Sequence, residues 1–229
     1  MKYEWLLFDL DDTILDFDIS ERYALEKALL RVGISFQPKH LTIYEKINRK
    51  CWDAFEAGSL PQAAINETRF SEFLAALALP ETNAIEFGNY YLTQLSEKAV
   101  FMEGAEALLD SIYKKYQLGI VTNGLKEVQR PKLKKNKLMH YFKIIVVSDE
   151  IGVSKPNTDF FDYAFAEMKF PSKERVLIIG DSLNSDVKGG LNYGIDTCWY
   201  NPNKKKNITT KTPTYEINNL NELNRLKII

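Results

Sequence analysis

The sequence predicts an α/β protein with a parallel sheet, interrupted by an inserted α-helical bundle. Two features of the chain lead to this fold class. Short apolar runs alternate with segments of helical periodicity in the second half of the chain, and this alternation implies right-handed crossovers between parallel strands. After the first apolar run comes a long stretch with helical periodicity and no strand signal. That stretch is therefore expected to be an insertion into the α/β pattern.

Three apolar runs, residues 3–8, 118–121 and 176–179, are expected to be buried strands, since each ends at a polar or glycine-rich turn and is followed by helical spacing. A fourth run, residues 144–147, fits between them, and a fifth, residues 197–200, follows Gly194. Two of the intervening helices have readable apolar faces. One face is formed by Ala105, Leu108, Leu109 and Ile112, and the other by Phe161, Ala164, Phe165 and Met168, with Asn157 as the N-cap. Residues 126–138 also have helical spacing, but Pro131 is expected to start, bend or break that helix.

Residues 18–99 are expected to form a small helical bundle, because apolar residues recur there at helical spacing. Gly33, Gly58 and Pro80 mark the ends of the first three helices. The four apolar stripes are Tyr23, Ala28, Leu29 and Val32; Leu41, Tyr44, Cys51 and Phe55; Phe70, Phe73, Leu74 and Leu77; and Ile85, Tyr91 and Leu95. The sequence thus predicts an α/β core of residues 1–17 and 100–229 and a helical cap of residues 18–99.

The composition argues against a nucleic-acid polymer or a membrane as the partner. The chain has 229 residues, 45% of them hydrophobic, a net charge of −1 and a pI near 6.2, so it lacks the basic excess of polyanion binders. No apolar run approaches the roughly 18 residues of a membrane helix, and too few residues precede Asp9 for a signal peptide. Cys51 and Cys198 are expected to be buried free thiols. A cytoplasmic location is the resulting expectation.

Three aspartates follow the first predicted strand, and apolar residues flank them on both sides. They are Asp9, Asp11 and Asp12 in the segment FDLDDTIL. Like charges placed close together disfavour their own ionised forms. A cation or a reacting group near these carboxylates would offset that electrostatic cost.

Other polar residues follow the remaining strands, and in open α/β sheets ligands bind at the carboxyl ends of the strands. Asp9, Asp11 and Asp181 suit a hard cation such as magnesium (Mg²⁺), which prefers oxygen ligands. Thr122, with the amides of Asn123 and Gly124, suits an anion at a strand-to-helix turn. Lys155 and Asp186 are expected at the same edge. A metal site, an anion site and a lysine beside a carboxylate indicate phosphoryl transfer.

At this point the order of the motifs resembles that of the haloacid dehalogenase superfamily of aspartate-nucleophile phosphatases. The four motifs appear in order as LLFDLDDTIL, LGIVTNG, GVSKPN and IIGDSLNSD. Together they cover the α/β core, and the resemblance implies a Rossmann-like haloacid dehalogenase fold. The insertion after the first motif resembles the helical cap of this superfamily, which closes over the site.

The resemblance also implies a role for each motif residue. Asp9 would attack phosphorus to form an aspartyl-phosphate, and Asp11 would serve as the acid and base. Magnesium would be bound by the side chains of Asp9 and Asp181 and by the backbone carbonyl of Asp11. Asp186 would lie behind the metal and orient a bound water or Lys155. The phosphoryl group would be held by Thr122, Asn123 and Gly124. Lys155 would offset the charge of that phosphoryl group.

Several activities share these motifs. Asp11 is present, whereas related haloalkanoic acid dehalogenases lack this acid, so phosphate-ester chemistry is favoured. The core segments look most like bacterial house-cleaning pyrimidine 5′-nucleotidases, which implies a small-molecule nucleoside monophosphate as substrate. A sugar-phosphate phosphatase or phosphomutase of the same superfamily is the alternative, and a non-catalytic binding protein with this fold is a third possibility.

Plainer interpretations are favoured for residues outside the motifs. Asp12 is expected to be structural or to cap a turn, because neighbouring side chains diverge in an extended segment. Arg69 is expected to form a surface salt bridge rather than to bind a phosphate or a base. Trp52, Phe55 and Tyr91 are expected to pack in the core of the cap rather than to stack on a base.

Overall fold

The structure is a computed structural model that describes residues 2–207, 209–225 and 228–229. The chain forms two compact units, one of Met1–Phe17 with Ala99–Ile229 and the other of Asp18–Lys98. This division differs by one residue, Ala99, from the division expected from the sequence. The role of the second unit as a cap stays a prediction.

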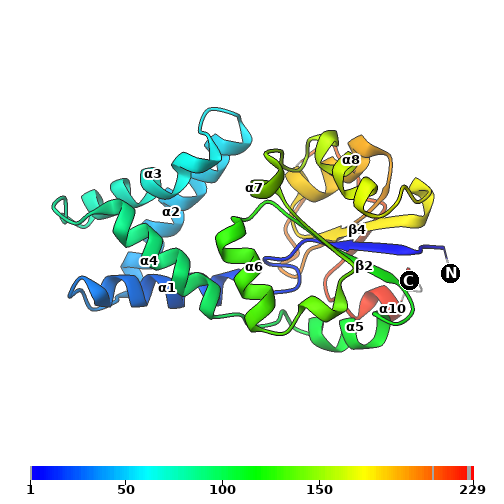
Figure 1. Cartoon of the computed structure of the whole chain (residues 1–229), viewed down its shortest axis with the longest axis horizontal. Coiled ribbons are helices and arrows are strands. Elements are labelled where there is room, and N and C mark those ends of the chain that lie inside the picture. The colour runs from blue at the N-terminus through cyan, green and yellow to red at the C-terminus, as the bar shows by residue number, and fades with distance from the viewer. Residues whose placement is uncertain (1, 208, 226–227) are drawn as a thin grey trace. The chain divides into compact units, whose positions relative to one another are not determined.

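Within the described residues, a single parallel sheet of six strands forms the centre of the first unit (Figure 1). The strand order is β3-β2-β1-β4-β5-β6, so the parallel α/β fold class is confirmed. The strands are β1 (Trp5–Phe8), β2 (Gln117–Thr122), β3 (Ile144–Val147), β4 (Val176–Gly180), β5 (Asp196–Tyr200) and β6 (Tyr215–Ile217). The sequence missed β6, because this short edge strand buries Ile217 but exposes Glu216 and therefore lacks a continuous apolar run.

Both faces of the sheet are buried, which explains why the central strands read as continuous apolar runs. Side chains alternate between the faces of a strand. Leu6 and Phe8 of β1 belong to one hydrophobic cluster, and Trp5 and Leu7 belong to the other. Each of these side chains contributes roughly 1.5–3 kcal/mol by leaving water.

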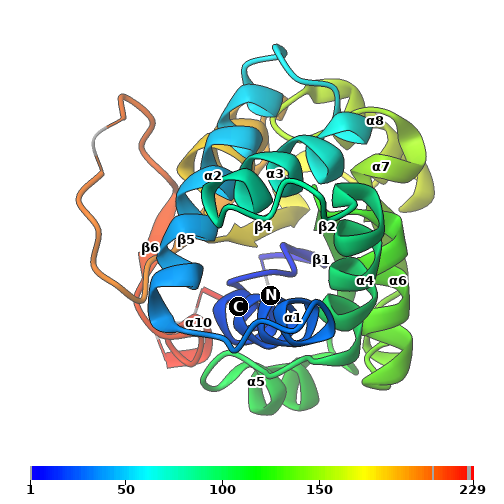
Figure 2. The same ribbon diagram turned by 90° about the vertical axis from the view of Figure 1, so that its left-hand side faces the viewer.

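Helices cover the two faces (Figures 1 and 2). On one face lies α5 (Ala105–Ile112), whose predicted apolar residues are all buried in the first cluster. On the other lies α8 (Thr158–Glu167), which packs into the second cluster. The Asn157 side chain accepts the N–H of Asp159 at 3.0 Å, as predicted for its N-cap. The remaining helical segments of this unit are α6 (Lys126–Lys135), η1 (Met139–Tyr141), α7 (Ser148–Ile151), η2 (Lys173–Arg175), η3 (Leu183–Val187), α9 (Lys188–Tyr193) and α10 (Glu222–Arg225).

Pro131 neither starts nor ends a helix, so those two outcomes of the sequence prediction are wrong. It lies inside α6, where it removes one donor from the hydrogen-bond ladder. The helix is held against the rest of the first unit by buried residues on both sides of Pro131, namely Val128, Gln129, Lys132 and Leu133.

The second unit consists of helices (blue to green in Figure 2). They are α1 (Phe17–Arg31), whose first residue still belongs to the first unit, α2 (Pro38–Glu56), α3 (Gln62–Ala76) and α4 (Ala84–Glu97). Tyr44, Phe70, Phe73 and Tyr91 pack against one another in its interior, so the core role predicted for Tyr91 is confirmed. Ile85 is 49% exposed and lies off the buried stripe expected for α4.

The surface position expected for Arg69 is wrong. Its side chain is buried, and it donates hydrogen bonds to Asn48 Oδ1 at 3.1 Å and Asn66 Oδ1 at 3.3 Å. These partners come from α2 and from the preceding turn of α3, so a pattern of local charges does not reveal them.

Two further sequence expectations can be compared with the structure. Cys51 and Cys198 are buried free thiols, as expected. A helix with the length and apolar character needed to cross a bilayer does not occur among the described residues.

Candidate active site

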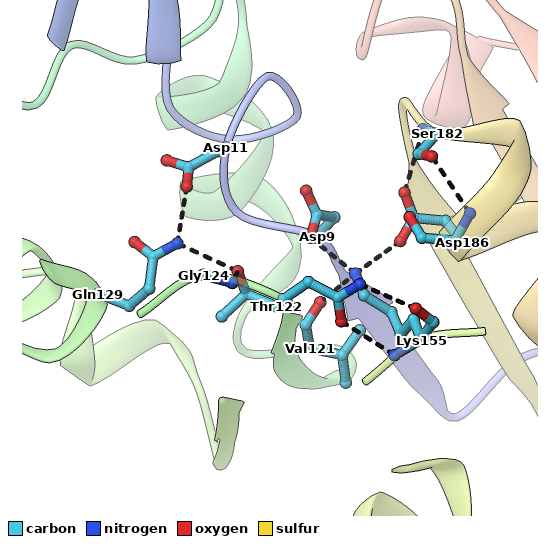
Figure 3. Close-up of polar contacts among 11 residues, drawn as sticks. Asp9, Asp11, Val121, Thr122, Gly124, Gln129, Lys155, Ser182 and Asp186 are labelled. Atoms are coloured by element: carbon cyan, nitrogen blue, oxygen red, sulfur yellow. Dashed lines mark hydrogen bonds and ion pairs between the residues drawn. The ribbon is translucent and has the colours of Figure 1, made fainter. Parts of the chain in front are cut away.

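The predicted site residues meet at the carboxyl end of the sheet because β1 lies between β2 and β4. Asp9 directly follows β1, Thr122 ends β2, and Asp181 directly follows β4. Lys155, from the segment after α7, reaches into the same place (Figure 3). The structure thus brings residues from distant parts of the first unit into one polar centre.

Lys155 is the buried cation of this centre. Its ammonium donates to Asp9 Oδ1 at 2.7 Å, to Asp186 Oδ1 at 2.6 Å and to the carbonyl of Val121 at 2.6 Å. These bonds use all three donors that a lysine has. Lys155 therefore orients the two carboxylates and offsets part of their charge, and the direct substrate contact predicted for it would require one of the bonds to break.

Asn123 holds the backbone of Lys155 in place. Its side chain accepts the N–H of Lys155 at 2.9 Å and donates to the carbonyl of Lys155 at 2.9 Å. The Asn123 side chain thus aligns the lysine, while the contact predicted between the Asn123 amide of the turn and the phosphoryl group stays a prediction.

Three carboxylates lie close enough to share one cation. Asp9, Asp181 and Asp186, here called the carboxylate cluster, each offer an oxygen within 4.8 Å of the others. Asp186 Oδ2 accepts the N–H of Ser182 at 3.1 Å, while Oδ1 accepts from Lys155. Gly180 leaves the room for this side chain, because a Cβ at that position would lie 2.2 Å from Asp186 Oδ2. The predicted contact between Asp186 and Lys155 is present.

The shifted pKa values of the centre show that its carboxylates are disfavoured in their ionised forms. Burial raises the pKa of Asp9 to about 7, although the charge of Lys155 acts in the opposite direction. Burial, followed by the charges of Asp186 and Asp9, raises the pKa of Asp181 well above its usual range. Burial alone would lower the pKa of Lys155, but its two carboxylate partners outweigh that effect and raise it. One lysine does not offset three neighbouring carboxylates, and the oxygen donors fit a hard divalent cation such as magnesium.

The hydroxyl of Thr122 is prepared to donate a hydrogen bond. Its Oγ1 accepts the N–H of Gly124 at 3.1 Å and Nε2–H of Gln129 at 3.1 Å. A hydroxyl has two acceptor positions and one hydrogen, so these contacts leave the hydrogen available to an anion. The sequence instead predicted that the Gly124 amide would face the anion; in the structure it supports the hydroxyl.

Asp11 is held by two residues that the sequence analysis missed. Its Oδ2 accepts from Gln129 Nε2 at 2.6 Å, and its Oδ1 accepts from Lys132 Nζ at 2.9 Å. Both partners lie on α6. Because α6 is rich in lysine, the sequence suggests that these two residues face solvent. The signal that could have revealed them is their i, i+3 spacing beside Val128 and Leu133, which are buried.

Asp12 lies in the turn that follows Asp11. It has a positive φ of 57°, and its Oδ1 accepts the N–H of Phe17 at 3.0 Å. This geometry agrees with the turn-capping role expected from the sequence.

Comparison with protein families gives a match over most of the chain. A family model described as haloacid dehalogenase-like hydrolase matches residues 6–200. That range contains every residue of the polar centre.

Relatives match along almost their whole length. Pyrimidine 5′-nucleotidase YjjG of Escherichia coli is 31% identical over 99% of this chain and 98% of its own. Pyrimidine 5′-nucleotidase PynA of Streptococcus pneumoniae is 34% identical over 97% of this chain and 94% of its own. The HAD-hydrolase YfnB of Bacillus subtilis is 39% identical over 97% of this chain and 94% of its own. A crystal structure of YfnB bound to magnesium has a TM-score of 0.94, with 38% identity and full coverage of both chains.

Proposed function

The chain belongs to the haloacid dehalogenase-like hydrolase family, and we propose that it is a magnesium-dependent phosphomonoester hydrolase acting on pyrimidine nucleoside monophosphates. The observation that carries this proposal is the pairing of Asp9 with the buried Lys155 beside Asp181 and Asp186. This pairing supports Asp9 as a carboxylate nucleophile beside a site for a divalent cation. The Asp9 side chain keeps 13% of its surface exposed, so a substrate can reach it.

In the first step, an oxygen of Asp9 forms a bond to phosphorus while the bond between phosphorus and the leaving oxygen breaks. Asp11 gives its proton to that leaving oxygen, which departs as the nucleoside hydroxyl. Thr122 donates to a phosphoryl oxygen, and Lys155 keeps the Asp9 carboxylate oriented. Covalent catalysis of this kind divides one difficult displacement into two easier ones.

In the second step, water attacks the phosphorus of the aspartyl-phosphate. Asp11, now ionised, takes a proton from that water, and the bond between phosphorus and the Asp9 oxygen breaks. Phosphate leaves, and both aspartates return to their starting states.

Magnesium fits the carboxylate cluster. The side chains of Asp9 and Asp181 and the backbone carbonyl of Asp11 would hold it, with Asp186 oriented behind them by Lys155 and Ser182. A bound magnesium ion supplies positive charge that neutralises the phosphate oxygens as negative charge develops on them.

A pyrimidine nucleotide is the proposed substrate because two full-length relatives are named pyrimidine 5′-nucleotidases. Phosphate-ester cleavage is favoured over carbon–halogen cleavage because Asp11 is available to protonate a leaving oxygen.

The proposal is tested by a panel of phosphate esters assayed for phosphate release. We expect uridine and thymidine 5′-monophosphates to have a higher kcat/KM than purine nucleotides or glucose 6-phosphate, and we expect a chelator to abolish turnover. Faster hydrolysis of a sugar phosphate would overturn the nucleotide assignment. No release from any ester in the presence of magnesium would overturn the phosphatase assignment.

Magnesium is also expected to stabilise the fold more strongly at pH 8 than at pH 5.5. Folding raises the pKa of Asp9 to about 7 and that of Asp181 in the same direction. These groups bind protons more tightly in the folded state, so the metal-free protein loses stability as the pH rises from about 4 through 7. Lys155 stays protonated over this range, because its pKa is raised from 10.5.

Saturating magnesium should raise Tm by about 5–10 °C at pH 8 and by less at pH 5.5, where protons compete for the same oxygens. Thermal melts with and without magnesium measure both shifts. Asp181→Asn should reduce the shift at pH 8. A shift that is equal at the two pH values, or larger at pH 5.5, would contradict the assignment of the carboxylate cluster as the metal site.

A further inference from the structure

We propose that Gln129 and Lys132 of α6 are positioning residues that hold Asp11 in the orientation from which it serves the leaving group. This inference rests on the proposed phosphatase function and adds two residues to it. All the residues concerned belong to the first compact unit. Figure 3 shows the Gln129 part of the contact, between Asp11 and Thr122.

The backbone of Asp11 is fixed by a tight turn after β1. Within the turn, the N–H groups of Ile14 and Leu15 donate to the carbonyl of Leu10 at 3.0 and 2.9 Å, and the N–H of Asp12 donates to the carbonyl of Leu15 at 2.7 Å. A fixed backbone does not fix the side chain, which still has rotamer freedom. The two contacts from α6 restrict that freedom by holding one carboxylate oxygen each.

Gln129 links Asp11 to Thr122, the residue proposed to bind the phosphoryl group. Its Nε2 lies 2.6 Å from Asp11 Oδ2 and 3.1 Å from Thr122 Oγ1. Gly124 makes this position possible, because a Cβ there would lie 2.1 Å from the same nitrogen. A single amide therefore sets the spacing between the acid/base and the hydroxyl that faces the phosphoryl group.

Lys132 approaches Asp11 from the protein interior. The lysine side chain is fully buried, whereas 24% of the Asp11 side chain remains exposed. The Lys132 ammonium also lies 5.7 Å from the centre of the Phe17 ring. The carboxylate is thus held on its buried side and stays open on the other.

Fold stability alone does not explain a buried lysine at this position. Replacing a buried ion pair with apolar side chains of similar volume is often neutral or stabilising. Leu133, next in sequence, shows that α6 accepts a fully buried apolar residue. Lys132 instead places its ammonium against one carboxylate oxygen, and this contact holds the Asp11 side chain in one orientation.

Leaving-group dependence separates positioning from a structural role. A phenol with several electron-withdrawing substituents leaves without protonation, whereas an alkyl hydroxyl needs the proton of Asp11. The parameter kcat/KM for a series of aryl phosphates reports the first phosphoryl transfer, before the common aspartyl-phosphate is hydrolysed. The slope of log kcat/KM against the pKa of the leaving group therefore measures how well Asp11 donates its proton.

We expect Lys132→Met and Gln129→Leu to steepen this slope toward that of Asp11→Asn. With 2,4-dinitrophenyl phosphate the losses should stay below about threefold, and with uridine 5′-monophosphate they should be about 10- to 100-fold, a fraction of the roughly 10²- to 10⁴-fold that a general acid contributes. Lys134→Met, on the exposed face of the same helix, is the matched control and should keep the wild-type slope.

Two variants, Lys132→Met and Gln129→Leu, are used so that the test still holds if one of them fails to fold. Gln129 Oε1 is buried without a partner among the described residues, so leucine removes one unsatisfied oxygen together with the two hydrogen bonds. Thermal melts establish which variants are folded. If the folded variants show the wild-type slope of log kcat/KM against the pKa of the leaving group, the positioning role is overturned, even where their overall activity is lower. If the wild-type protein hydrolyses none of the esters, the failure belongs to the proposed function instead.

Discussion

Asp9→Asn is expected to lower phosphate release from uridine 5′-monophosphate by at least about 10⁴-fold, as is typical when a covalent nucleophile is lost. The amide has nearly the shape of the carboxyl group but lacks the charge and nucleophilicity needed to attack phosphorus. Binding, the charge of Lys155 and the hydrogen bond from Thr122 remain, so a small residual rate is compatible with the mechanism. Initial rates under saturating magnesium measure the loss.

The same variant should remain folded, because it removes a carboxylate whose ionised form burial disfavours. A thermal melt provides this control. Mass spectrometry of acid-quenched wild-type enzyme should find one phosphoryl group on the peptide that contains Asp9, and Asp9→Asn should lack it. Activity within tenfold of wild type would refute Asp9 as the nucleophile.

The central strands could be predicted because their position in the fold dictates their composition. Strands buried on both faces, such as β1 and β4, must be apolar at every position, and their ends then locate Asp9 and Asp181. The edge strand β6 escapes this reasoning because Glu216 is exposed. Sequence patterns reveal an element to the extent that burial constrains consecutive residues.

The chemistry of the centre was less accessible to sequence reasoning. The three acceptors of Lys155 belong to Asp9, Val121 and Asp186, which are far apart in the chain. Gln129 and Lys132 on α6 were missed for the same reason, since their partner Asp11 follows a different strand. Spacing in the sequence identifies residue types at strand ends, but the direction of each hydrogen bond depends on the packed structure.

Lys155→Met is expected to have the largest effect on stability. Methionine fills a similar volume, but the substitution leaves Asp9, Asp186 and the carbonyl of Val121 without their buried donor. Removing one partner of a buried ion pair typically costs about 3–5 kcal/mol. We expect a loss of this size in the free energy of unfolding of the metal-free protein at pH 8, measured by urea denaturation.

The loss should be smaller at pH 5.5. Without Lys155, the pKa of Asp9 should rise above its value of about 7 in the intact centre, because the charge of Lys155 lowers it. Asp9 in the variant is then protonated at pH 5.5 and no longer needs a cationic partner. The stability of the variant should therefore fall more steeply than that of the wild type as the pH rises from 5.5 to 8.

The activity of Lys155→Met tests whether orientation of Asp9 is the main contribution of the lysine. Magnesium should restore part of the lost stability, because it replaces the missing positive charge, yet kcat should remain reduced by about 10²-fold or more, since a misplaced nucleophile loses its favourable attack geometry. Lys134→Met, which removes an exposed lysine of α6, should change stability by less than about 0.5 kcal/mol. A loss below about 1 kcal/mol for Lys155→Met at pH 8, or full activity once magnesium is added, would show that the carboxylates do not depend on this lysine.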